Sequence, residues 1–162
     1  MQLRAATRAS GFTLIELMIV VVIATILFSI AVPSYMQQVR QSRRTEAKTA
    51  MLDLAGREES FYSTNGSGYT AAAASLGYTG FGAANPLGSG YYYLSVCSPA
   101  AAACNGLGIP NAPAAPSYQI VATPLGGQLN DAQCAQFGID STGQQYAVSS
   151  AGANNTAYCW SN

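Results

Sequence analysis

A long apolar stretch dominates the hydrophobic pattern near the start of the chain. From Phe12 to Val32 nearly every residue is apolar, but the carboxylate of Glu16 lies inside the stretch. As an α-helix these 21 residues would extend about 31 Å, which matches the hydrocarbon thickness of a bilayer. We therefore expect a membrane-length helix that carries one acidic side chain near its beginning.

A second helical pattern follows without a break. Five positions spaced by four, three, four and three residues lie on one helical face: Ala47, Met51, Leu54, Glu58 and Phe61. This face is apolar except for Glu58, and the basic residues mostly lie elsewhere around the helix. We expect one helix from about residue 12 to about residue 62. Proline lacks an amide hydrogen, so Pro33 should kink this helix.

The pattern changes to strands in the second half of the chain. A Gly- and Ala-rich loop with short helical turns around Ala71–Leu76 precedes the segments 91–97, 117–124, 133–140 and 144–149, which are rich in β-formers. The turn sequence "DSTG" separates the last two and predicts a hairpin over 133–149. We expect an α+β fold, in which the amphipathic helix packs on an antiparallel sheet of three or four strands.

The distribution of charge separates the two halves. Only 9% of the residues are charged and the formal net charge is zero, but no Lys or Arg follows Arg57. The remainder of the chain is mildly acidic and mostly uncharged. A surface of this kind does not attract phosphates, so nucleic acid is an unexpected partner for that part.

All four cysteines lie in the C-terminal half, at positions 97, 104, 134 and 159. An even number fits a disulfide framework in an oxidising compartment, and four cysteines allow three pairings. The alternative is a structural zinc site, but the chain has no His and no Cys-x-x-Cys spacing.

The sequence offers no constellation for catalysis. The absence of His excludes Ser-His-Asp, Cys-His and His-metal sites, and no phosphate-binding or dinucleotide motif occurs. Asp131 and Asp140 are weak candidates for a calcium site, and turn roles fit them better. We therefore expect no catalytic residue, no cofactor and no metal, and an anchored enzyme has no site to support it.

Two cleavage sites compete at the N-terminus. Arg4 and Arg8 precede the apolar stretch as in a signal peptide, and the fragment Ser29–Ala31 is a weak cleavage site after it. A cut at Gly11–Phe12 instead keeps the helix in the mature protein. The second interpretation is favoured, because the stretch is long for a removable segment and continues directly into the amphipathic helix.

The motif "GFTLIELMIVVVIATILFSIAVPSY" resembles the N-terminus of type IV prepilins. The resemblance implies that a prepilin peptidase cuts before Phe12, that the new N-terminal Phe12 is N-methylated, and that the helix remains as an assembly core. The segment "PSYMQQVRQSRRTEAKTAMLDLAGREESFYSTNGSGYT" further resembles PilE-like minor pilins. The matching positions in the first motif are Gly11, Phe12, Thr13, Leu14, Glu16 and Pro33.

The resemblance also implies a domain plan. Residues 1–11 would be a removed leader, 12–33 a transmembrane and filament-core helix, 34–62 the amphipathic half of that helix, and 63–162 a globular domain. The favoured pairings are Cys97 with Cys104, which would close a short local loop, and Cys134 with Cys159, which would tether the last segment to the sheet like the C-terminal disulfide loop of pilins. Such disulfides would stabilise a head that has only a small sheet.

The expected function is that of a structural subunit, with minor pilin as the favoured role, in a pilus that supports assembly, adhesion or twitching motility. The expected partners are other pilin subunits, the prepilin peptidase, the inner-membrane assembly machinery and, before assembly, membrane lipid. The subunit would cross the inner membrane once with its globular domain in the periplasm, and would become extracellular in the pilus. The alternatives are a competence-type DNA-receptor minor pilin and a type II secretion pseudopilin.

Glu16 and the flanking charges each leave a question open. Glu16 either reaches the headgroups near the helix end or pairs with the Phe12 amine of another subunit and so sets the docking register. Two basic residues precede the apolar stretch and four follow within about 16 residues. A plain positive-inside count would therefore place the C-terminus in the cytoplasm, against the orientation that the resemblance implies.

Overall fold

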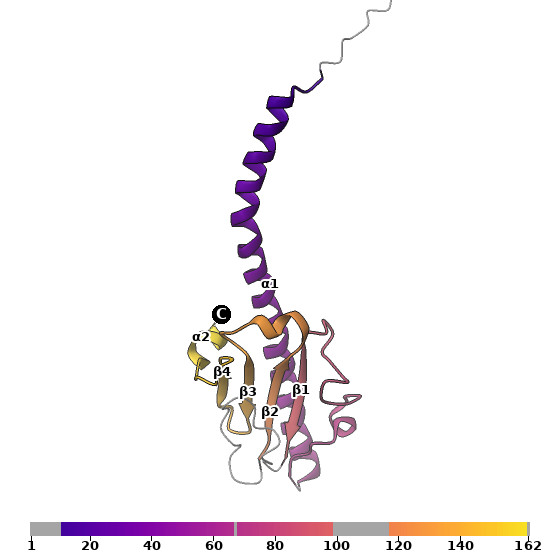
Figure 1. Cartoon of the computed structure of the whole chain (residues 1–162). Helices are drawn as coiled ribbons and strands as arrows, with labels where there is room; N and C mark the ends of the chain where they lie inside the picture. Colours follow the sequence, from indigo (N-terminus) through magenta and orange to yellow (C-terminus); the bar gives the residue numbers. More distant parts are fainter. Residues whose placement is uncertain (1–10, 67, 99–116, 162) are drawn as a thin grey trace, which may run out of the picture. The chain divides into compact units, whose positions relative to one another are not determined.

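The computed structural model describes residues 11–66, 68–98 and 117–161. The chain divides into two units, Met1–Gln38 and Val39–Asn162. Below, residues 11–38 are called the anchor segment and Val39–Asn162 the head. Helix α1 (Leu14–Asn65) begins in the anchor segment and ends in the head (Figure 1). The predicted division after residue 33 and the kink at Pro33 stay predictions, and α1 is assigned as one helix through Pro33.

Within the apolar stretch of the anchor segment, α1 itself accepts the hydrogen bonds of the Thr25 and Ser29 hydroxyls. The hydroxyl of Thr25 donates to the Val22 carbonyl at 2.8 Å, and that of Ser29 donates to the Ile26 carbonyl at 2.7 Å. Backbone amides are bonded within the helix, and these hydroxyls are bonded to it. Such a segment leaves little polar character for its surroundings to solvate, as a hydrocarbon environment requires.

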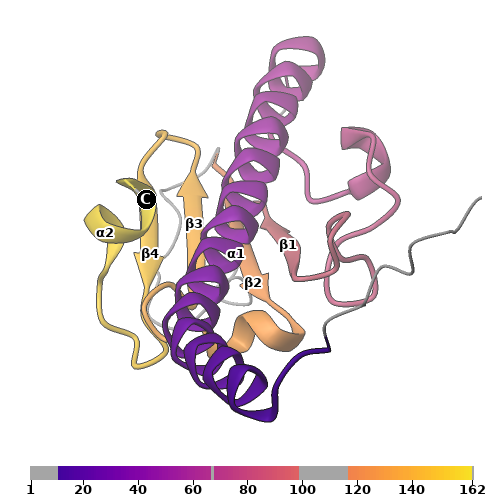
Figure 2. The ribbon, with the colours of Figure 1, turned by 90° about the horizontal axis from the view of Figure 1, so that it is seen from above.

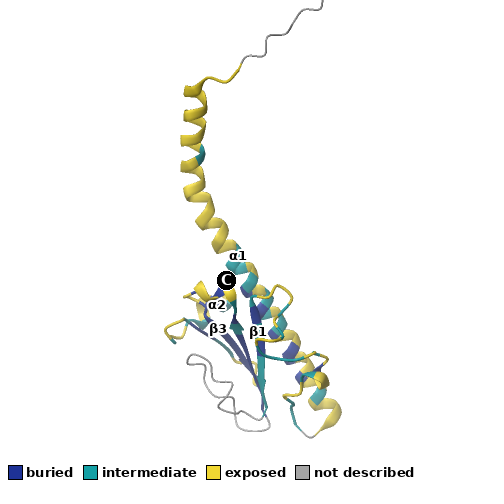
Figure 3. Cartoon of the chain, turned by 45° about the vertical axis from the view of Figure 1, so that its right-hand side comes forward, coloured by how far each residue is buried: buried dark blue, intermediate teal, exposed yellow. Residues whose placement is uncertain are grey.

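In the head, α1 buries one face against the sheet. Its buried residues are Arg44, Ala47, Met51, Leu54, Ala55 and Glu58. The predicted stripe is therefore confirmed, with Phe61 partly buried at its end. Figure 3 shows that buried positions on α1 occur only in the head. The helix ends at Asn65, three residues later than predicted, where Gly66 takes the left-handed conformation with φ 62°.

The sheet has four antiparallel strands in sequence order: β1 (Tyr92–Cys97), β2 (Gln119–Pro124), β3 (Gln136–Asp140) and β4 (Gln145–Val148). The register places Leu94, Ala122, Phe137 and Ala147 in one row across the strands. All four side chains are buried, and they belong to the same core cluster as the stripe of α1. Figure 2 shows α1 crossing this sheet. The predicted α+β fold, the four strand segments and the hairpin are confirmed.

Short helices complete the head: η1 (Ala73–Leu76), η3 (Gly126–Asn130) and α2 (Thr156–Ser161). The first confirms the helical turn expected around Ala71–Leu76. In the hairpin turn, Asp140 accepts hydrogen bonds from the Thr142 and Gln144 amides at 2.8 and 3.1 Å, and Gly143 has φ 78°. Asp140 therefore shapes a turn, because its carboxylate is occupied by the loop that it closes.

Candidate functional site

The first candidate site is the beginning of α1, where the predicted cleavage and assembly residues lie. Phe12 is 80% exposed, and Gly11 and Thr13 are also exposed and precede the helix. A Cβ built on Gly11 would meet no atom within 4 Å. Packing within the described part of the chain therefore does not require glycine at this position. A requirement for Gly11 would have to come from another protein that binds the chain around the Gly11–Phe12 peptide bond.

Glu16 has a local role that the sequence reading missed. The amide of Glu16 donates to the Thr13 hydroxyl at 3.3 Å, and the amide of Thr13 donates to the Glu16 carboxylate at 3.4 Å. This reciprocal pair is a capping box, in which two residues three apart satisfy free amides at a helix N-terminus. A carboxylate in the first turn also interacts favourably with the helix dipole. The spacing Thr-x-x-Glu before an apolar run was the available signal.

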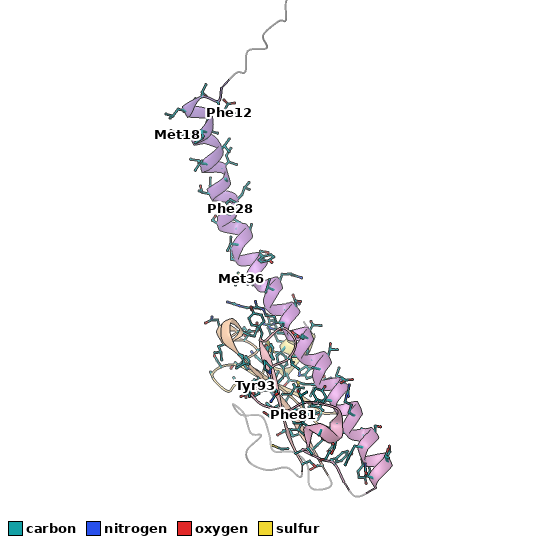
Figure 4. The ribbon with its side chains drawn as sticks, turned by 90° about the vertical axis from the view of Figure 1, so that its right-hand side faces the viewer. Phe12, Met18, Phe28, Met36, Phe81 and Tyr93 are labelled. Atoms are coloured by element: carbon teal, nitrogen blue, oxygen red, sulfur yellow. A yellow bond between two sulfur atoms is a disulfide. The ribbon has the colours of Figure 1, made fainter. Side chains whose placement is uncertain are left out.

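Beyond Glu16 the anchor segment exposes an apolar surface on all sides. Side chains such as Met18, Phe28 and Met36 project outward from α1 (Figure 4). The most apolar 18-residue window of this helix contains no buried residue, and by length and composition the helix can cross a membrane. Soluble monomers rarely expose an apolar surface this large. Such a surface is typical of a segment that contacts lipid or another protein.

The head contains a second site, a buried ion pair that clamps α1 to the sheet. The Arg44 guanidinium donates through Nε and Nη2 to both Asp131 oxygens at 2.7 Å. Gln128 Nε2 and the Cys134 amide donate to the same carboxylate at 3.0 and 3.3 Å. Burial by itself would lower the pKa of Arg44, but its hydrogen bonds and its attraction to Asp131 outweigh this and raise the pKa.

The position of Arg44 corrects one sequence expectation. The basic residues of this helix were expected mostly away from the apolar face, but Arg44 is only 7% exposed. Glu58, the one polar residue of the predicted stripe, is fully buried. It accepts a hydrogen bond from the Thr70 amide at 3.1 Å. Burial raises the pKa of Glu58, with the Thr70 amide opposing and the charge of Glu59 adding to the rise.

The C-terminal segment is fastened to the same region. Cys134 and Cys159 form a disulfide with their Cα atoms 5.7 Å apart, so this predicted pair is confirmed. The Lys48 ammonium donates to the Cys159 carbonyl at 3.2 Å, and burial followed by the charge of Arg44 lowers the Lys48 pKa. Trp160 donates from Nε1 to the Tyr146 carbonyl at 2.9 Å.

The remaining predicted sites are the Cys97–Cys104 disulfide and the candidate calcium site at Asp131 and Asp140. The predicted partner of Cys97 is Cys104, which lies outside the described residues. Asp131 and Asp140 lie in separate hydrogen-bond networks. Across residues 11–66, 68–98 and 117–161, the structure brings together no group of three or more Cys, Asp or Glu that could hold a metal ion.

Two families of known proteins match two adjoining parts of this chain. Residues 7–32 match the family described as "Prokaryotic N-terminal methylation motif". Residues 33–138, which make up more than half of the chain, match the family described as "Type IV minor pilin ComP, DNA uptake sequence receptor". The chain belongs to this family of type IV minor pilins. The resemblance predicted from the sequence is therefore confirmed, and the DNA-receptor family was the stated alternative.

This minor pilin is also similar to a curated relative. The "Type IV major pilin protein PilA" of Myxococcus xanthus (strain DK1622) is 48% identical over 56 residues, which are 35% of this chain. The alignment covers 26% of the relative, so this chain spans about a quarter of that protein's length. The matching families are structural and not enzymatic. They associate the chain with pilin assembly and with membrane anchoring through the apolar helix.

Proposed function

We propose that this chain is a minor subunit of a type IV pilus that enters the filament through its anchor segment. The fully exposed apolar surface of that segment carries the proposal, because such a surface needs first a lipid bilayer and then the helices of other subunits. Before assembly the subunit crosses the inner membrane once with its head in the periplasm. The inner-membrane assembly machinery then transfers it to the extracellular pilus.

Processing precedes assembly in this proposal. The prepilin peptidase cuts between Gly11 and Phe12, and Phe12 is then N-methylated. Gly11→Val should block the cut, because added bulk at an open, exposed position can matter only to an enzyme that binds it. Intact-mass measurement of the membrane-associated protein detects loss of residues 1–11. Gly56→Ala is the matched control, since Gly56 is also exposed with open space around it. Normal cleavage of Gly11→Val would refute the site.

Glu16 directs docking through the amine that cleavage creates. An ammonium and a carboxylate about 4 Å apart in an apolar filament core attract strongly, and either is costly when unpaired. Their pairing between subunits favours one axial register. The capping box adds a competing explanation, in which Glu16 only stabilises the first turn of its own helix.

Two variants separate these roles. Glu16→Gln keeps a capping side chain but removes the charge, and Glu16→Ala removes both. Both variants should insert and be cleaved, and both should be depleted from sheared filaments relative to the membrane pool. Ser29→Ala is the control on the same helix. If Glu16→Gln enters filaments at the wild-type level, Glu16 acts only as a helix cap and the charge-pairing role is refuted.

The family match favours a second candidate function, reception of DNA during uptake. The cations available for phosphate are few: Arg40, Arg43, Lys48 and Arg57. If all four contacted phosphates, log K would fall against log salt with a slope of about −4, and fewer contacts would give a shallower slope. Titration of the full-length protein with duplex DNA at several salt concentrations tests this, with a shuffled sequence as the specificity control. If the protein does not bind duplex DNA at physiological salt, the DNA-receptor function is refuted and only the structural function is left.

A further inference from the structure

The four cations that follow the apolar stretch within about 16 residues differ in their environments. Arg44 is buried in the ion pair with Asp131, and Lys48 is partly buried against the Cys159 carbonyl. Arg40 and Arg43 are partly exposed, and among the described residues neither forms an ion pair with a carboxylate. The fold thus leaves two positive charges available at this end of the head.

Arg43 lies beside an aromatic ring and the η3 turn. Its guanidinium carbon is 3.4 Å from the centre of the Tyr91 ring, and Nη1 would lie 3.8 Å from a Cβ on Gly127. Arg40 is one helical turn earlier on the same side of α1, because residues three apart are neighbours on a helix. Figure 2 shows η3, the orange helical turn that follows β2 in the chain, next to α1.

The η3 turn adds an exposed apolar side chain to these charges. Leu129 is 64% exposed, and Gly126 and Gly127 present bare backbone beside it. We call this surface the basic end of the head: Arg40, Arg43, Tyr91 and the exposed η3 residues Gly126, Gly127, Leu129 and Asn130. Cationic, aromatic and exposed apolar groups occur together where proteins lie at a lipid–water interface.

The chain itself keeps the basic end near the bilayer. Only seven residues lie between Val32 and Arg40, which corresponds to a rise of about 12 Å along a helix. Long arginine side chains extend toward the headgroup layer, and surface charges act over a Debye length of about 8–10 Å. Arg40 is therefore within electrostatic reach of the leaflet that borders the anchor segment, and Arg43 follows it by three residues.

We infer that the basic end binds the phosphates of anionic phospholipids while the subunit waits in the membrane, and so docks the head on the leaflet before assembly. This inference rests on the proposed membrane anchoring. Lipid is favoured over nucleic acid because the basic end holds only two cations, because Arg43 adjoins the η3 turn that carries the exposed Leu129, and because both arginines closely follow the anchor segment.

Hydrogen–deuterium exchange of the processed, full-length protein in nanodiscs tests this inference. One set of nanodiscs contains only phosphatidylcholine, and the other contains phosphatidylglycerol as well. An arginine near an anionic surface contributes roughly a fivefold preference, so two contribute up to roughly thirtyfold. We expect the peptide containing Gly126–Asn130 to exchange more slowly by up to that factor in anionic nanodiscs, with the difference lost at high salt.

Matched variants identify the charges responsible. The double variant R40Q/R43Q should lose the lipid dependence, and R40K/R43K should retain it because charge without guanidinium geometry suffices. R57Q is the control, since Arg57 lies in a later turn of the same helix. A loss in R57Q as large as that in R40Q/R43Q would overturn the inference.

The remaining outcomes separate this inference from the anchoring proposal. Equal exchange in both lipids overturns the docking inference alone. Failure of the protein to stay in either nanodisc overturns membrane anchoring, and the inference with it. Slower exchange with duplex DNA in phosphatidylcholine nanodiscs, without an effect of phosphatidylglycerol, reassigns the basic end to nucleic acid.

Discussion

The Arg44–Asp131 ion pair should be the most sensitive electrostatic contact in the head. Asp131→Asn keeps the shape of the side chain but removes the charge that Arg44 needs in a buried site. The Gln128 and Cys134 donors would then face a neutral amide in place of a carboxylate. The perturbation therefore leaves an uncompensated buried cation without opening a cavity.

The expected loss of stability is large. Removing one partner of a buried pair costs about 3–5 kcal/mol. For a unit of roughly 120 residues, the entropy of unfolding converts each kcal/mol into about 4 °C. The melting temperature of the head should therefore fall by about 12–20 °C. The double variant R44M/D131N should recover part of this loss, because it removes both charges together.

Thermal unfolding of the full-length protein in mild detergent, followed by near-ultraviolet circular dichroism, measures the effect. Asp53→Asn is the matched control, because Asp53 pairs with Arg57 on the surface, where the side chains are 52% and 46% exposed. Exposed pairs of this kind contribute about 0.2–1 kcal/mol. If Asp131→Asn lowered the melting temperature no more than Asp53→Asn does, the assignment of Arg44–Asp131 as a buried clamp would be refuted.

Three further predictions concern the core of the head. Burial raises the pKa of Glu58, so the folded head holds this proton to a higher pH than the unfolded chain does. Stability should fall as the pH rises from the ordinary glutamate range through the raised pKa, and Glu58→Gln should flatten that fall in melting curves recorded across pH. Replacing Cys134 and Cys159 together by Ser should cost about 3–4 kcal/mol in denaturant unfolding, because the bridge closes a loop of 25 residues. A small loss would mean that the unfolded chain is not much constrained by it. Leu54→Ala should cost about 2–5 kcal/mol and the exposed Leu52→Ala far less, and equal losses would contradict the packing of α1.

Several features of the chain followed from local patterns in the sequence. The apolar stretch, the helical stripe and the four strands were predicted because periods of 3.6 and 2 residues report which side of each element is buried. The hairpin followed from its turn residues. The Cys134–Cys159 pair came instead from the resemblance to pilins, since spacing alone allowed three pairings. The capping role of Glu16 was also predictable from Thr13 three residues earlier, because a Thr-x-x-Glu spacing before an apolar run is typical of a helix N-terminus.

Only the tertiary structure decided which distant residues meet. Arg44 and Asp131 are 87 residues apart, and nothing in the spacing of either residue indicates the other. The burial of Glu58 and the exposure of Arg43 beside Tyr91 likewise depend on where the loops around the sheet return to α1. Periodicity assigns a residue to a face of its own element, whereas the partner on that face is set by the packing of elements that the sequence separates. The sequence by itself therefore determined an anchored pilin with an amphipathic helix on a sheet, and the fold decided which of its charges are buried and paired and which remain available to a partner.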